Sequence, residues 1–144
     1  MYRLNEESMF FDMSEDQAIV IDSDSGVYYA MNMLASHVFE YITKGVGIQE
    51  LQEALSQLPD CPEDIRIRLE SFVAQLLAGR IIVEDEDNIF EGNIEADVIW
   101  FMEGKELILE SYQDMTELIT ADPVHDVDVE FGWPVLKDED ANNV

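Results

Sequence analysis

Residues 21–32 read IDSDSGVYYAMN and place a turn, a strand and the start of a helix next to one another. The Asp and Ser residues of this stretch favour a turn, in which Gly26 supplies a positive φ. The β-branched and aromatic residues from Val27 to Met31 are typical of a strand. Asn32 suits the N-cap of a helix, because its side-chain oxygen accepts a hydrogen bond from the first helical turn.

Two apolar runs lie upstream of this stretch, at residues 9–13 and 17–21, with Ser14-Glu15-Asp16 between them. Such short connections predict antiparallel pairing. We therefore expect a three-stranded meander, and its third strand, residues 27–31, forms an edge.

Three helices are predicted after Asn32. Apolar residues at helical spacing place the first at residues 33–42, the second at about 48–58 and the third after Pro62. Asp60 and Glu63 form a capping box for the third helix, and Gly79 ends it at the C′ position. Residues 81–83 predict a short final strand. The order β-β-β-α-α-α-β over residues 8–83 predicts an α+β, winged-helix-like domain.

The last third of the chain has a weaker pattern. Residues 94–101 alternate as a half-buried strand does, Glu103-Gly104 suits a hairpin turn and residues 105–110 return. Residues 111–120 suggest a short helix, and a strand followed by a helix fits better than one long helix. Residues 124–136 are expected to be extended and residues 137–144 to be disordered. We divide the chain into a domain at 1–87 and an acidic C-terminal extension at 88–144.

Charge narrows the classes of partner. The chain has 33 acidic and seven basic residues, for a net charge of −26, and residues 81–144 hold 19 of the acidic ones. Nucleic acids and anionic membranes are bound through basic residues, so neither is expected as a partner. A basic or neutral partner is compatible, although the charge also has the simpler role of solubility. With no signal-peptide pattern and no apolar stretch of roughly 20 residues, we expect a cytoplasmic protein.

Catalysis and metal binding have little support. The chain has two histidines and one cysteine, and the apolar neighbours of His37 indicate a structural role. Cys61 at a helix start is not expected to be reactive. The best metal candidates are His125, Asp126 and Asp128, but a single imidazole is weak evidence. We expect no enzyme activity, cofactor or metal.

The tail around Trp133 is left with two interpretations: a solvated acidic tail or a specific binding segment. As a binding segment, it has three alternative docking places, which are the domain's own groove, a modifying enzyme and a second copy of the chain. If it docks in the groove, it competes with any other ligand there.

The order and spacing of these elements resemble the PqqD family over residues 8–84. Residues 21–32 are similar to that family's acidic turn, aromatic strand and Asn before the first helix. Residues 33–40 look like its first helix, in which a small residue precedes an apolar-aromatic pair. Residues 48–55 look like its second helix, and residues 65–83 look like its third helix and final strand. No single motif is diagnostic, so the likeness lies in the order.

The resemblance implies a non-catalytic recognition element for ribosomally synthesised precursor peptides. Such domains bind the leader of the precursor and present it to a modifying enzyme, such as a radical SAM enzyme, a cyclase or a protease. The leader adds as an extra strand to the third strand of the meander, under the third helix. The same short-looped meander is compatible with a homodimer formed by domain swapping.

The residues agree with this mode of binding. An edge strand offers unpaired backbone groups, which an extended peptide satisfies by β-augmentation. Alternation puts Tyr28 and Ala30 on one face and Val27 and Tyr29 on the other, and either face is open to packing on the helices. The candidate peptide-binding residues are Val27, Tyr28, Tyr29, Ala30, Arg66, Leu69, Phe72, Val73 and Leu76.

Each of these residues also has a structural alternative. Core packing explains Leu69, Phe72 and Leu76, and local ion pairs with Glu63 or Glu70 explain the arginines at 66 and 68. Two other functions remain open: an accessory or scaffold subunit of a modification enzyme that binds no leader, and a winged-helix transcriptional regulator. The regulator fits less well, because its recognition helix would be basic, and residues 62–80 hold three arginines against three acidic residues.

Overall fold

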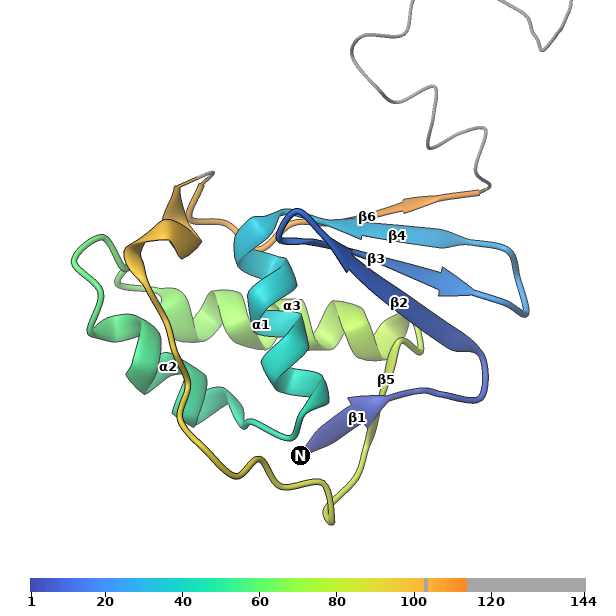
Figure 1. The fold of residues 1–144 in the computed structure, drawn as a ribbon, viewed down its shortest axis with the longest axis horizontal. Helices are drawn as coiled ribbons and strands as arrows, with labels where there is room; N and C mark the ends of the chain where they lie inside the picture. The colour runs from blue at the N-terminus through green and yellow to red at the C-terminus, as the bar shows by residue number, and fades with distance from the viewer. Residues whose placement is uncertain (103, 114–144) are drawn as a thin grey trace, which may run out of the picture. The chain divides into compact units, whose positions relative to one another are not determined.

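The computed structural model describes residues 1–102 and 104–113, and Met1–Tyr112 form one compact unit (Figure 1). The strands of this unit are β1 (Tyr2–Leu4), β2 (Met9–Ser14), β3 (Gln17–Asp22), β4 (Tyr28–Met31), β5 (Ile82–Glu84) and β6 (Leu109–Tyr112). Its helices are α1 (Met33–Thr43), α2 (Ile48–Ser56), α3 (Ile65–Ala78) and the 3₁₀ helix η1 (Val98–Phe101). The α+β class and the predicted meander and three helices are confirmed.

The larger sheet has the order β2-β3-β4-β6 and is antiparallel throughout. Strands β2 and β3 are joined by two residues, Glu15 and Asp16, which both have positive φ. Two such residues form the turn whose twist matches the right-handed twist of the strands, so the connection fixes their register. A separate two-stranded sheet pairs β1 with β5.

The core lies between the larger sheet and the helices (Figure 1). Alternate residues of β3, Ala18 and Val20, are fully buried on the side of the sheet that faces α1, and Val38 and Phe39 of α1 are buried in the same core. The apolar stripe predicted for α3 is buried in the same core. Alternation by two in the strands and by three or four in the helices thus brings one apolar face of each element inward.

The ends of the helices confirm one predicted cap and correct two. Asn32 caps α1 as predicted, since its side chain accepts a hydrogen bond from the Ala35 N–H. Helix α3 does not start at the predicted capping box, because the Cys61 and Ile65 N–H groups bond to the carbonyls of Leu58 and Pro62 in two successive turns. The helix begins only after those turns, with Asp64 at its N-cap.

The C-terminal end of α3 differs from the prediction by one residue. The Arg80 N–H donates to the Leu77 carbonyl and the Ile81 N–H to the Leu76 carbonyl, which is the hydrogen-bond pattern of a Schellman motif. Arg80, with φ of 60°, therefore occupies the left-handed position that we predicted for Gly79. Gly79 has an ordinary helical φ of −82°.

The strand predictions outside the meander need correction. Strand β1 was not predicted, and its partner is β5, so the final strand of the domain does not join the meander. The strand predicted at 94–101 is wrong: residues 94–97 have no regular structure, and η1 follows. The helix predicted at 111–120 is wrong at its start, where Ser111 and Tyr112 belong to β6.

Several predictions fall outside the described residues: the rest of that helix, the extended segment at 124–136, the candidate metal ligands from His125 to Asp128, and Trp133. Within residues 1–102 and 104–113, no group of His, Cys, Asp and Glu is placed to hold a metal ion. No helix in the same part of the chain is long and apolar enough to cross a membrane. The predicted domain boundary at residue 87 stays a prediction.

Candidate functional site

Strand β4 carries three of the candidate residues, Tyr28, Tyr29 and Ala30, and its two sides are distinct. The Asp22 N–H donates to the Val27 carbonyl at 2.9 Å, and Tyr29 lies opposite Val20 of β3. Hydrogen-bonded pairs alternate along an antiparallel ladder, so Tyr29 directs its backbone groups toward β3. Tyr28 and Ala30 direct theirs to the opposite side, where an added strand would bind.

That side of β4 is occupied by β6 of the same chain (Figure 1). The register places Tyr112 opposite Tyr28, Glu110 opposite Ala30 and Leu109 opposite Met31. The expectation that residues 27–31 form an edge is therefore wrong in this conformation. The predicted meander of three strands is part of a four-stranded sheet, and the fourth strand, β6, comes from the C-terminal extension.

Asn32 and Arg68 fix the segment that leads into β6. The Asn32 side chain donates to the Glu106 carbonyl at 2.7 Å and accepts from the Ile108 N–H at 3.3 Å. Arg68 of α3 donates to the Lys105 carbonyl at 2.8 Å. All three bonds join side chains of the domain to backbone groups of the segment, so they do not depend on its side chains.

The two tyrosines of β4 lie on opposite faces. Tyr29 packs against the core beside Gly79, on the same face as the buried Val20 and Met31. Burial raises the pKa of the Tyr29 phenol, and the nearby Asp22 carboxylate raises it further. Tyr28 and Ala30 lie on the other face, where they are opposite Tyr112 and Glu110. The sequence did not decide which face of β4 packs on the helices, and the structure shows that it is the face that carries Tyr29.

The candidate residues of α3 divide into two groups. Leu69, Phe72, Val73 and Leu76 are buried in the core, in agreement with their structural alternative. Arg66 bonds to Glu70 at 3.0 Å and to Gln52, and Arg68 pairs with Asp64 at 2.8 Å. In this conformation the predicted α3 residues therefore contact their own domain.

Sequence reasoning missed the face of α3 that lines the groove beside β6. A shallow groove of about 310 Å³ lies between α3 and the segment before β6, and it is lined by Ile67, Arg68, Ser71, Gln75, Glu106 and Leu107. Ile67 is 66% exposed there. An isoleucine on the polar side of an amphipathic helix was the signal that could have indicated this face.

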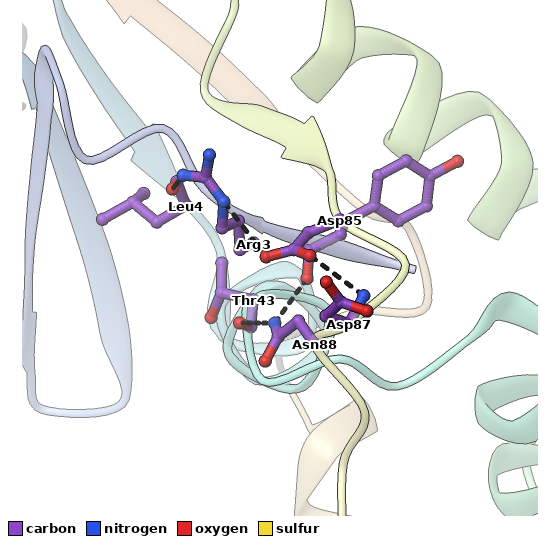
Figure 2. Close-up of polar contacts among 7 residues, drawn as sticks. Arg3, Leu4, Thr43, Asp85, Asp87 and Asn88 are labelled. Carbon is purple, nitrogen blue, oxygen red and sulfur yellow. Dashed lines mark hydrogen bonds and ion pairs between the residues drawn. The ribbon is translucent and has the colours of Figure 1, made fainter.

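Residues 85–102, which we call the strap, follow β5 and cross the helices before the segment that leads into β6. Figure 2 shows its first anchor, where the Asn88 amide donates to the Tyr2 carbonyl at 2.7 Å and to the Thr43 carbonyl at 3.0 Å. Beside it, Arg3 and Asp85 form an ion pair of 3.2 Å. A Cβ atom at Gly45 would lie 2.3 Å from the Asn88 carbonyl oxygen, so only glycine lets the strap pass this close.

The strap is fixed again at its far end by aromatic contacts. Trp100 stacks on His37 with ring centroids 4.9 Å apart and planes 9° from parallel, and Tyr41 contacts both Trp100 and Phe90. Trp100 and Phe101 are buried. His37 is therefore a packing partner of the strap.

Cys61 is partly buried, and burial raises the pKa of its thiol although Arg68 opposes the shift. A raised pKa lowers the fraction of thiolate, which is the reactive form. The Cys61 thiol contacts the Pro62 carbonyl at 3.5 Å, and Nε2 of His37 lies 3.6 Å from the Asp16 carboxylate.

Comparisons with known proteins agree with this geometry. Residues 17–82 match the model of the family described as coenzyme PQQ synthesis protein D (PqqD), which confirms the resemblance over that range. A solved structure described as TbiB1 in complex with the TbiA(beta) leader peptide has the same fold, with a TM-score of 0.51 and 13% sequence identity. The match covers 59% of this chain and 99% of that chain. None of the curated proteins compared matches the sequence. Strand β6 lies beyond the end of the family match.

Proposed function

We propose that this protein binds the leader region of a ribosomally synthesised precursor peptide and performs no chemistry itself, because residues 17–82 match the model of the PqqD family. The leader adds as an antiparallel strand to β4 and is presented to a modifying enzyme, such as a radical SAM enzyme, a cyclase or a protease. The candidate binding residues are those of β4 and the α3 face beside it.

One observation supports this function above the others: the outer side of β4 accepts a strand. The backbone groups of Tyr28 and Ala30 point there, and β6 already pairs with them. Backbone pairing gives affinity that depends little on sequence, and pockets for alternate side chains add specificity. The groove beside α3 is such a pocket. Arg68 in its lining and Asn32 before α1 donate hydrogen bonds to backbone carbonyls of the segment that leads into β6.

A second candidate function has its own support. An accessory or scaffold subunit would keep the fold and use no leader, and a β4 already covered by β6 fits that role. A DNA-binding regulator has less support, since both arginines in the first turns of α3 pair with carboxylates of the helix region.

Calorimetry on the full chain tests the proposal. The probe is a synthetic leader of the precursor peptide encoded beside this protein's gene, and a scrambled leader is the control. Saturable binding of the leader alone supports the function. If no binding is measured up to about 1 mM, which corresponds to roughly −4 kcal/mol, and a modifying enzyme still co-purifies with the chain, the scaffold function is the better account.

A further inference from the structure

Strand β6 makes the contacts that an incoming leader needs. It runs antiparallel to β4 and lies opposite Tyr28 and Ala30, whose backbone groups point outward. The Asn32 N–H donates to the Ile108 carbonyl at 3.4 Å, which extends the ladder by one pair. A leader on β4 would use the same donors and acceptors, so the leader and β6 cannot bind there together.

The side chains of this segment show which pattern the groove accepts. Leu107 and Leu109 are half-buried and pack against the core, whereas Ile108 between them is 41% exposed. Leu109 lies opposite the buried Met31, on the helix-facing side of the sheet. The site beside β4 and α3 thus accepts aliphatic side chains at two positions of the bound strand that are two residues apart, on the face that alternation turns toward the helices.

The contacts of β6 itself are few. The strand has four residues, and Glu110 and Ser111 are both exposed. A short strand at the border of a sheet opens at a small fraction of the free energy of global unfolding. The adjoining strap is held much more firmly, through the buried Trp100 and Phe101. Release of β6 therefore leaves it tethered close to its site.

A tether makes β6 a strong competitor. A segment held by a short linker has an effective concentration of about a millimolar at its site. If β6 occupies the site on β4 about nine-tenths of the time, a free peptide binds there about tenfold more weakly than it would bind a site that is always open. The affinity of the domain for a peptide is then set partly by its own C-terminal extension.

We propose that the segment Lys105–Tyr112 is a built-in competitor of the leader, and that the leader which displaces it has the same aliphatic-x-aliphatic pattern as Leu107-Ile108-Leu109. This inference rests on the proposed function, because it concerns the same site. It adds the class of peptide, which is an extended segment with two aliphatic residues two positions apart, and the step that precedes binding, which is release of β6.

The test uses the full chain and a labelled peptide with the sequence of residues 104–113, whose binding is measured by fluorescence anisotropy. Glu110→Pro removes an N–H that points toward Ala30 and so weakens β6 without changing the core. Ser111→Pro is the matched control, since the N–H of that residue points away from β4. We expect Glu110→Pro to bind the peptide at least about tenfold more tightly than the wild type. Ser111→Pro should resemble the wild type.

A peptide with both leucines replaced by serine should bind no protein. Equal affinity of the wild type and a folded Glu110→Pro protein for the peptide of residues 104–113 would overturn the inference. So would equal affinity of Glu110→Pro for that peptide and for the peptide in which both leucines are serine. If a thermal melt shows that Glu110→Pro is unfolded, Leu109→Ser in the full chain replaces it, with the same expected gain.

The cognate leader separates this inference from the proposed function. A leader that binds the wild type and Glu110→Pro equally well would leave the function standing and refute the competition. The opposite result is also distinct: the peptide of residues 104–113 binds Glu110→Pro, and the leader binds neither protein. In that case β6 is a displaceable strand, and leader binding is not the function.

Discussion

The side-chain amide of Asn32 donates a hydrogen bond of 2.7 Å to the carbonyl oxygen of Glu106, 74 residues further along the chain. The oxygen of the same amide accepts from the Ala35 N–H at 3.1 Å and so caps α1. One side chain therefore begins the first helix of the domain and also holds the segment that leads into β6.

Substitutions of Asn32 should separate these two roles. Asn32→Asp keeps an oxygen for the cap and loses the donor to Glu106, whereas Asn32→Ala loses both. We expect Asn32→Ala to lower the free energy of unfolding by about 1 kcal/mol and Asn32→Asp to lower it less. Both should speed hydrogen exchange of the β6 amides. Unchanged exchange in Asn32→Asp would mean that this bond does not hold β6.

Tyr28→Pro should abolish leader binding. Proline has no N–H, and the Tyr28 N–H lies on the side of β4 where β6 or a leader pairs. The fold should survive, because this N–H is not directed at β3. Calorimetry gives the binding and a thermal melt gives the fold, with Tyr28→Phe as the control. Full binding by a folded Tyr28→Pro protein would exclude β4 as the binding strand.

A disulfide between β4 and β6 should close the site. Ala30 and Glu110 are directly opposite, and a hydrogen-bonded pair has Cα atoms about 5.5 Å apart, within the range of a disulfide. In a Cys61→Ser background, the Ala30→Cys and Glu110→Cys double variant should not bind the leader when oxidised and should bind it when reduced. The Glu110→Cys single variant is the control. Equal leader affinity in both redox states would show that release of β6 is not required.

Arg80→Gly should stabilise the protein. Arg80 has a positive φ of 60° at the end of α3, where a residue with a Cβ atom is strained. Glycine relieves that strain, and we expect a gain of about 1 kcal/mol in the free energy of unfolding. Arg80→Ala keeps the strain and should show no gain in urea denaturation. If alanine stabilises as much as glycine, the arginine side chain and not the backbone is the cause.

Tyr29 should make stability fall at alkaline pH. Its pKa is raised in the folded chain above the ordinary value of 10.0, so the folded state holds this proton more tightly than the unfolded state does. Its contribution is complete below pH 10 and is lost as the pH rises through the folded pKa. The difference in free energy of unfolding between Tyr29→Phe and the wild type should therefore shift in favour of the variant above pH 10. A constant difference would contradict this account.

The elements that the sequence predicts well are those with a local cause. The meander follows from three apolar runs with turn residues between them, and α1 begins where Asn32 can cap it. The start of α3 was mispredicted because Asp60 and Glu63 form a capping pattern that two successive turns override. The three residues of β1 are too few to show a period.

The candidate site was predicted only in part, because its last component comes from elsewhere in the chain. The pattern of Val27–Met31 indicates a strand and says nothing about which segment pairs with it. Tyr28 and Tyr112 meet across 84 positions of sequence, and no local period records such a pairing. The buried ridge of α3 was read correctly as apolar, but the residues that line the groove lie one step around the helix.

The cover that β6 gives to β4 also bears on how copies of this protein meet. An uncovered strand at the border of a sheet is a template on which a second molecule can add its own strand, and proteins accumulate in aggregates through such contacts. With β6 in place, two copies cannot join through β4, and the exposed carboxylate of Glu110 adds charge at the new border. As long as β6 stays paired, β4 should therefore not be a site at which a second copy of the chain adds a strand.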